Sequence, residues 1–428
     1  MSQLRRRQFI GLGGAAALAV GVAGCGGGGG GGAGSASLRV AWYGGQPVHD
    51  GLEEALAEFS EAHSELALST EQASFDDYWD RLATQVAGGE GPDVLRMSMT
   101  WLADYADRGA LADLSEYEGG LIDTAALDDD AVEGGRMDTG LYGVGQSSIT
   151  QATFGNTRLA EEYGVELPAV WTWEDFVQVS KEFADAAGPG MYGTTDAGGN
   201  FQMFEVWARQ HGTELFAGES LAVSAEIIEE WLVMWQDLRD AGAAPQPDVT
   251  AESDTFETSQ LSQLNAVVSF GWVQQVTFLQ PIIPDHPLEI LDMPGSMAGD
   301  RSGQFLSALD FWCLTSSAGA PEAAADLIDF LVNDEGAARS IGLALGVPPS
   351  ETGREALGAD PDSAEGRAVA YVESLQGETG PPPAPWPSGY GDVEGTAFPR
   401  MNEEVGFGEK TPSEAAGEFL EAGQRALG

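Results

Sequence analysis

The chain has 428 residues, with 68 acidic and 19 basic side chains, a formal net charge of -49 and an isoelectric point near 4.1. Repulsion of that size excludes nucleic acid and anionic membrane surfaces as partners. Hydrophobic residues make up 43% of the chain, so a packed core is expected and the acidity does not indicate disorder. The acidic residues are dispersed along the chain, which indicates a protein adapted to molar salt, where screening removes most of the repulsion between its own charges. The alternative is an ordinary acidic extracytoplasmic protein.

The first residues predict export and lipid anchoring. Arg6 and Arg7 precede an uncharged run with five glycines between Gly11 and Gly24, and Cys25 is followed by seven more glycines. The arginines resemble a twin-arginine signal, and Val-Ala-Gly-Cys resembles the lipobox at which a signal peptidase exposes a cysteine for lipid. So many glycines disfavour the alternative, a transmembrane helix. We expect a signal peptide at 1–24, then a lipidated Cys25 and a Gly-rich tether at 25–35.

The next segments alternate between strand and helix patterns. Residues 38–42 predict a strand, and Asp50 with Glu53 predicts a capping box at the start of a helix. Residues 75–86 have a helical pattern, and residues 92–97 predict another strand. This βαβα order indicates a parallel sheet covered by helices.

Further along, the pattern continues over the rest of the chain. Thr172 with Asp175 predicts a helix start, residues 264–270 a strand, and Pro321 the first turn of a helix. The proline-rich residues 377–387 predict irregular chain. Four residues predict one helical face, and the two tryptophans among them are expected in the core: Ile228, Trp231, Trp235 and Leu238.

Motifs for catalysis or metal binding are weak. No Gly-x-Ser-x-Gly motif follows the signal, and the four histidines show no metal-ligand spacing. The run Gly408-Glu409-Lys410-Thr411 lacks the upstream glycine of a phosphate loop. With 68 carboxylates, a pair at glycosidase separation is expected by accident. Cys313 is the other cysteine, so lipidation of Cys25 would leave no intrachain disulfide. We expect no catalytic residues, cofactor or metal.

A family resemblance is carried by motifs in a fixed order. The central ones are Gly140-Leu141-Tyr142-Gly143, Thr153-Phe154-Gly155-Asn156-Thr157 and Leu167-Pro168-Ala169-Val170-Trp171-Thr172. Others lie at 92–94, 109–114, 265–272, 293–295, 321–331, 346–348 and 411–415. Together they resemble the extracellular solute-binding proteins of carbohydrate ABC importers, the family 1 group that contains maltose-binding protein. The chain departs from the pattern at Ala308-Leu309, where Gly-Gly is common.

The resemblance implies an α/β fold of the two-lobed periplasmic-binding-protein kind, type II, with a mainly parallel sheet flanked by helices in each lobe and a hinge between them. We expect lobe one at 36–150 plus 312–350 and lobe two at 151–308 plus 351–428. The crossings are expected near 149–154 and 309–314. Ligands of open α/β sheets bind beyond the carboxyl ends of strands, and a hinge lets two lobes close on one solute.

Candidate ligand contacts are the aromatic and polar residues expected near the strand ends, because sugars present apolar CH faces to rings and hydroxyls to polar groups. The resemblance implies ring stacking on Trp272 and a further platform on the late loop. The candidate ligand-binding residues are Trp42, Tyr43, Trp101, Gln146, Trp272, Asp310, Trp386 and Tyr390. Core packing is the alternative for each aromatic residue, and is favoured for Trp171 and Trp173.

These observations favour a lipid-anchored binding protein on the outer face of the cytoplasmic membrane, which captures a sugar or oligosaccharide for import. Its partners would be the solute, the transmembrane subunits of an ABC permease and the cytoplasmic ATPase behind them. One alternative is a receptor of the same fold for a polyamine or a glycerol phosphate, with Arg96 or Arg301 binding the phosphate. A less favoured alternative is a secreted glycan-active enzyme.

Overall fold

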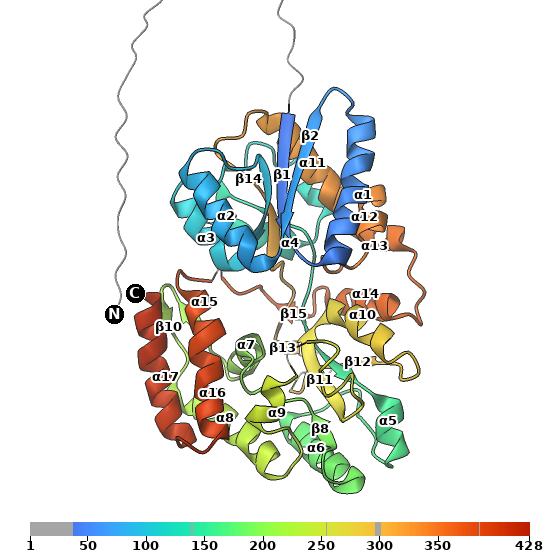
Figure 1. The fold of residues 1–428 in the computed structure, drawn as a ribbon, viewed down its shortest axis with the longest axis vertical. Coiled ribbons are helices and arrows are strands. Elements are labelled where there is room, and N and C mark those ends of the chain that lie inside the picture. The colour runs from blue at the N-terminus through green and yellow to red at the C-terminus, as the bar shows by residue number, and fades with distance from the viewer. Residues whose placement is uncertain (1–36, 138–139, 254, 296–300, 385) are drawn as a thin grey trace, which may run out of the picture. The chain divides into compact units, whose positions relative to one another are not determined.

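The computed structural model describes residues 37–137, 140–253, 255–295, 301–384 and 386–428 (Figure 1). The predicted signal peptide, Cys25 and the glycine tether lie outside these residues. Within the described part of the chain, no helix is long and apolar enough to cross a membrane. The fold is α/β and two-lobed, with a helix-flanked sheet in each lobe.

Lobe one is built on a five-stranded sheet of order β2-β1-β3-β14-β6. β1 pairs parallel with β2 and β3, whereas β14 runs antiparallel to β3 and β6. The strands are β1 Ser37–Tyr43, β2 Ala67–Ala73, β3 Val94–Ser98, β6 Val144–Gly145 and β14 Asp310–Leu314. β14 enters the sheet from the other lobe, which explains its opposite direction and makes the sheet mixed rather than mainly parallel.

Helices cover both faces of this sheet because β1 alternates its side chains between two cores. Leu38, Val40 and Trp42 lie in one buried cluster, and Ala41 and Tyr43 lie in the other. In Figure 1, α1 and α12 lie to one side of the sheet and α2 and α3 to the other. The helices are α1 Gln46–Ala62, α2 Phe75–Ala87, α3 Met99–Asp107, η1 Thr124–Ala126, α4 Asp129–Glu133, α11 Pro321–Asn333, α12 Glu335–Ile341 and α13 Glu351–Leu357.

Lobe two has a four-stranded sheet of order β12-β7-β11-β8, in which β7 runs antiparallel to both of its neighbours. The strands are β7 Gln151–Gly155, β8 Tyr192–Thr194, β11 Ala266–Trp272 and β12 Glu289–Leu291. Its helices are α5 Thr157–Glu162, α6 Trp173–Ala187, α7 Phe201–Gln210, α8 Ala225–Asp240, α9 Pro247–Ala251, η2 Val273–Gln275, α10 Val276–Leu279, η3 Gln280–Ile282, α14 Ala364–Leu375, α15 Tyr390–Asp392, the π-helix η4 Val393–Ala397, α16 Phe398–Gly406 and α17 Pro412–Leu427.

Short strand pairs complete the described chain. β4 Arg136–Met137 pairs with β5 Gly140–Leu141, and β9 Phe216–Ala217 pairs with β10 Ser220–Leu221. β13 Arg301–Phe305 pairs with β15 Thr379–Gly380, which lies in the proline-rich segment expected to be irregular.

The chain passes between the lobes at 146–150, between β6 and β7, and at 306–309, between β13 and β14. Single bridges join Ser148 to Val347 and Ile149 to Ser307, so these two segments and residue 347 lie side by side. The predicted ranges assigned residues from 351 onward to lobe two. In the structure α13 packs on α12 of lobe one and α14 packs on α10 of lobe two, so a third passage lies at 358–363.

The local predictions had mixed outcomes. The capping box at Thr172 and Asp175 is confirmed at the start of α6, and Ile228, Trp231, Trp235 and Leu238 form the buried face of α8. The capping box at Asp50 and Glu53 is wrong. The N-cap of α1 is Gly45, five residues earlier, because Pro47 fits the first turn, and the Asp50 carboxylate accepts a hydrogen bond from Gln46 Nε2 at 2.6 Å.

Candidate functional site

The strand ends of lobe one hold a buried polar cluster. Tyr43, the last residue of β1, donates its hydroxyl hydrogen to Asp310, the first residue of β14. Arg96 Nη2 donates to Asp310 Oδ2 at 2.8 Å, and Arg96 Nη1 donates to the Tyr43 carbonyl at 2.6 Å. Burial raises the pKa of Asp310 to about 8 and lowers that of Arg96 to about 9, whereas their direct contact favours both charged forms. Tyr43 and Asp310, two predicted ligand contacts, therefore bind each other and Arg96.

An aromatic cluster lies beside these strand ends. We call it the lobe-one aromatic cluster: Tyr43, Phe75, Tyr78, Trp79, Trp101 and Tyr105. Phe75 begins α2 directly after β2, and Trp101 lies in the first turn of α3 directly after β3. Phe75 is 48% exposed, and its ring centroid lies 5.1 Å from that of Tyr43. The Trp79 and Trp101 rings, 5.9 Å apart, are packed against the core but only partly buried. The cluster therefore offers accessible ring surface at the strand ends of lobe one.

Lobe two has a cavity of about 570 Å³, with several polar side chains in its lining, at the N-terminus of α7. It is lined by residues of α7, α9, η4 and α16, among them Asn200, Gln202, Thr250 and Glu394. Gln202 Nε2 donates to Glu394 Oε1 across the cavity wall, at 2.5 Å. A smaller cavity of about 150 Å³ shares Thr250 in its lining. Amide, hydroxyl and carboxylate groups of this kind are suited to sugar hydroxyls.

A buried ion pair fixes the floor of this cavity. Arg239 Nε and Nη2 each donate to the Asp196 carboxylate at 2.9 Å, and Nη2 also donates to Asn402 Oδ1 at 2.6 Å. Both charged side chains are almost fully buried, at 0% and 1% exposed. Such a two-pronged contact holds Asp196 and Asn402 in one geometry.

Helix α3, which carries part of the lobe-one aromatic cluster, touches α15 of lobe two. A Cβ placed on Gly391, in α15, would lie 3.6 Å from the Thr100 methyl carbon, in α3. Trp101 follows Thr100, and Glu394 follows Gly391 by three residues. Elements that carry parts of the lobe-one aromatic cluster and of the lobe-two cavity therefore meet at this contact between the lobes.

Two buried amides lie at the ends of the first passage between the lobes. Gln146 follows β6 and Gln151 begins β7, and they are 5% and 2% exposed. Neither side-chain amide has a hydrogen-bond partner within the described residues. A buried amide left unpaired costs about 1–3 kcal/mol, so both groups favour a polar occupant beside the passage.

The other predicted aromatic contacts are buried. Trp42 is fully buried in the core and donates its indole hydrogen to His49 Nδ1 at 3.1 Å. Trp272, at the end of β11, is 8% exposed and packs in the cluster that contains Ile149. The Trp386 and Tyr390 rings stack at 3.9 Å and are 3% and 1% exposed. This conformation offers almost no face of these four rings to a ligand, which corresponds to the core-packing alternative.

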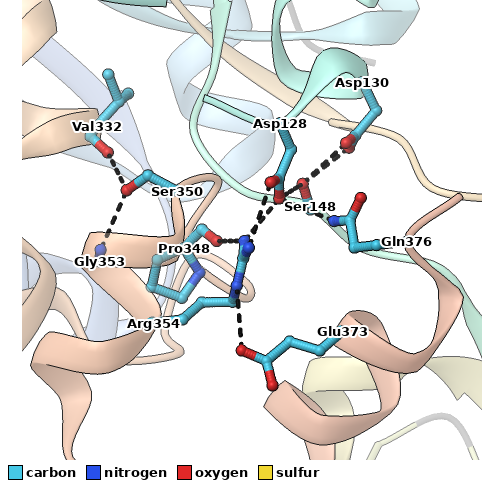
Figure 2. A network of polar contacts seen from close by, with 10 residues as sticks. All are labelled: Asp128, Asp130, Ser148, Val332, Pro348, Ser350, Gly353, Arg354, Glu373 and Gln376. Carbon is cyan, nitrogen blue, oxygen red and sulfur yellow. Dashed lines mark hydrogen bonds and ion pairs between the residues drawn. The ribbon is translucent and has the colours of Figure 1, made fainter. Parts of the chain in front are cut away.

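The passage between the lobes is braced by a polar network (Figure 2). Asp128 accepts hydrogen bonds from Arg354 Nη1 at 2.6 Å and from Gln376 Nε2 at 3.0 Å. Arg354 Nε also lies 3.6 Å from the carboxylate of Glu373 in α14. Since Asp128 and Arg354 belong to lobe one and the other two residues to lobe two, the network links the lobes.

Ser148 connects the first passage to the same network. Its hydroxyl lies 2.9 Å from Asp130 Oδ2 and 3.2 Å from Asp128 Oδ2 (Figure 2). Burial raises the pKa of Asp130 to about 7, although the hydrogen bond from Ser148 opposes the rise. Ser148, Asp128 and Asp130 therefore have hydrogen-bond partners among themselves, whereas the side-chain amides of Gln146 and Gln151 have none within the described residues.

The most voluminous groove described, about 930 Å³, lies elsewhere. It runs between α6 and α8 and is lined by Val177, Trp207 and Met234 with several carboxylates. It contains none of the predicted ligand contacts and no strand end. We therefore do not assign ligand binding to it.

Sequence reasoning missed Phe75, Trp79, Gln202 and Glu394. Phe75, Tyr78 and Trp79 follow the spacing i, i+3, i+4 at the start of a predicted helix, a signal that was available. Nothing in the sequence distinguished Glu394 from the other carboxylates. The proposed phosphate ligand Arg96 is already bound to Asp310 and Tyr43, and the side chain of Arg301 lies outside what the structure describes.

A family model for bacterial extracellular solute-binding proteins matches residues 54–369. An uncharacterized lipoprotein of Streptomyces antibioticus is 32% identical over 149 residues, an alignment that spans 33% of this chain and 31% of the relative.

Solved structures have the same fold at lower identity. A periplasmic oligogalacturonide-binding protein of Yersinia enterocolitica, in complex with saturated digalacturonic acid, has a TM-score of 0.77 and 23% identity, covering 92% of this chain and 98% of that one. A receptor of Streptomyces glaucescens, solved unliganded and with acarbose, has a TM-score of 0.72 and 17% identity, covering 92% of this chain and 98% of that one.

Proposed function

The chain belongs to the bacterial extracellular solute-binding proteins, and from that membership we propose that it captures a sugar or oligosaccharide between its lobes and delivers it to an ABC import permease. It acts without catalysis, and a lipid on Cys25 holds it at the outer face of the cytoplasmic membrane. Closure of the lobes on the solute is the signal that the permease subunits read, and the cytoplasmic ATPase drives import.

One observation carries this proposal. Lobe one has a partly exposed aromatic cluster, lobe two has a cavity with polar side chains in its lining, and elements that carry parts of each meet where Thr100 lies beside Gly391. Rings stack on the CH faces of sugars, while amides and carboxylates bind the hydroxyls. The solved relatives named for oligogalacturonide and acarbose support a saccharide over the alternatives. The engagement of Arg96 by Asp310 weakens the glycerol phosphate alternative.

The test is a thermal-shift and tryptophan-fluorescence screen of the body from Ala36 onward, in molar potassium chloride. The panel contains mono- and oligosaccharides, polyamines and glycerol phosphates. A ligand at 100 times its dissociation constant should add about 2.7 kcal/mol to the free energy of unfolding. Stabilisation by a saccharide without its hydrolysis supports the proposal. A response to polyamine or phosphate alone contradicts the substrate class, and bond cleavage contradicts the absence of catalysis.

Anchoring is tested by Cys25→Ser in the full chain. The name of the Streptomyces antibioticus relative and the lipobox-like Val-Ala-Gly-Cys run support lipidation. We expect the wild type in the membrane fraction and the variant released or unprocessed. Equal membrane retention of both proteins would contradict the lipid anchor.

A further inference from the structure

We propose that the lobe-two cavity selects neutral or amino-bearing saccharides and excludes acidic ones, and that Glu394 is the residue that sets this choice. The inference rests on the proposed function, because it names the charge class of saccharide that the same site accepts.

The lining of the cavity carries no cation to receive an acidic sugar. Its charged side chains are Asp196, Glu394 and Glu403, and the described lining includes no lysine or arginine. Asp196 is neutralised by Arg239. Two carboxylates, those of Glu394 and Glu403, remain without a cation in the lining and would repel a uronate placed between them.

The first turn of α7 already has a carboxylate beside it. α7 begins at Phe201 in the cavity wall, and the N-terminus of a helix favours negative charge. The Glu394 carboxylate accepts a hydrogen bond from the side-chain amide of Gln202 in the first turn. The protein therefore places one of its own carboxylates beside the first turn of α7, where that carboxylate would repel a ligand carboxylate.

Two buried arginines outside the lining already bind carboxylates. Arg239 is fully buried and binds Asp196 and Asn402. In lobe one, Arg96 binds Asp310 and the Tyr43 carbonyl. Freeing either guanidinium for a ligand carboxylate would leave a buried aspartate without its partner, which is costly. With a formal net charge of -49, the whole protein also repels an approaching anion.

Glu394 can accept a hydrogen bond from a ligand amine or hydroxyl. Gln202 binds one of its oxygens, Oε1, and burial raises the pKa of the carboxyl while that hydrogen bond opposes the rise. A protonated amine on a sugar would favour the charged carboxylate and form a charge-assisted hydrogen bond. A sugar hydroxyl can donate to the same oxygen, so neutral saccharides are accepted too.

The experiment compares trimers of galactose, glucosamine and galacturonic acid on the body from Ala36 onward, by fluorescence titration at low and molar salt. The variants are Glu394→Gln, which removes the charge at nearly constant shape, and Glu409→Gln as the control. Glu409 is exposed and lies outside the cavity lining. We expect the tighter of the first two trimers to bind at least about tenfold better than the galacturonic acid trimer, and this ratio to shrink in molar salt.

Glu394→Gln should weaken binding of the glucosamine trimer and strengthen binding of the galacturonic acid trimer, so the ratio of these two affinities should fall about tenfold. Glu409→Gln should leave this ratio unchanged. A galacturonic acid trimer that binds as tightly as the others, or a ratio unchanged by Glu394→Gln, overturns this inference but leaves saccharide capture standing. If no trimer and no saccharide of the wider panel binds, the proposed function fails, and the inference fails with it.

Discussion

The two lobes use clusters of aromatic residues in opposite ways. In lobe one, the cluster around Tyr43 leaves Phe75 half exposed at the start of α2. In lobe two, Trp386 and Tyr390 stack on each other and pack in the core with Phe201. The rings are of the same chemical type and both clusters lie near the contact between the lobes. What separates a surface for stacking from a core is the exposed fraction, which composition does not reveal.

The largest expected effect separates these two roles. Trp386→Ala should lower the free energy of unfolding by about 3–5 kcal/mol, because it removes a large ring that is 3% exposed and stacked on Tyr390. Trp101→Ala, in the partly exposed lobe-one aromatic cluster, should lower the free energy of unfolding by less. Urea unfolding of both variants without ligand measures the difference. Full stability of Trp386→Ala together with lost saccharide binding would instead favour the late loop as a ligand platform.

A second prediction concerns the buried carboxyl of Glu205, in α7. Glu205 is 1% exposed, and burial raises its pKa to about 8, although Arg209 opposes the rise. The folded state therefore holds a proton that the unfolded chain releases above its ordinary pKa of 4.5. As the pH rises from 4.5 to about 8, this group should destabilise the protein by about 1.4 kcal/mol per pH unit.

Glu205→Gln tests whether Glu205 destabilises the protein as the pH rises. The variant is neutral at every pH, so its stability relative to the wild type should increase steadily from pH 5 to 8 in urea unfolding at constant high salt. Glu219→Gln, exposed in the turn between β9 and β10, is the matched control and should not change the slope. Parallel pH profiles for wild type and Glu205→Gln would mean that Arg209 keeps the carboxyl ionised in the folded protein.

Helix and strand periodicity, a local signal, predicted the α/β class, whereas the two-lobed fold was implied by the family resemblance that the order of motifs carries. Sequence patterns placed β1, α6, α8 and α11 close to their observed positions. They missed β2, whose residues are mostly polar and partly exposed, so the alternation that marks a buried strand is weak. The start of α1 was missed because the turn at Pro47 competes with the capping box at Asp50.

The site was harder to predict because exposure depends on tertiary packing. Trp42 and Phe75 are both aromatic residues at the ends of lobe-one elements, yet one is fully buried and the other is 48% exposed. β1 turns Trp42 toward α1 and α11, whereas α2 turns Phe75 toward solvent. Likewise, Glu394 gains its neighbour Gln202 only through packing of η4 on α7, 192 residues apart in sequence.

The smallest expected effect on stability is also the sharpest test of lobe one. Phe75→Ala should change the free energy of unfolding by less than about 1 kcal/mol, because nearly half of the ring is already in solvent. The same variant should weaken saccharide binding several-fold to about tenfold, since stacking on an aromatic face contributes about 0.5–1.5 kcal/mol. Phe75→Trp should retain binding because the stacking surface remains.

Phe407→Ala is the matched control for this prediction. Phe407 is 57% exposed at the C-terminal end of α16 and lies outside both the lobe-one aromatic cluster and the lining of the lobe-two cavity. It should alter neither stability nor affinity. If Phe75→Ala and Phe407→Ala bind saccharide equally well in fluorescence titrations, exposure at the strand ends of lobe one does not mark the ligand surface. The distinction between the two clusters would then be one of stability alone.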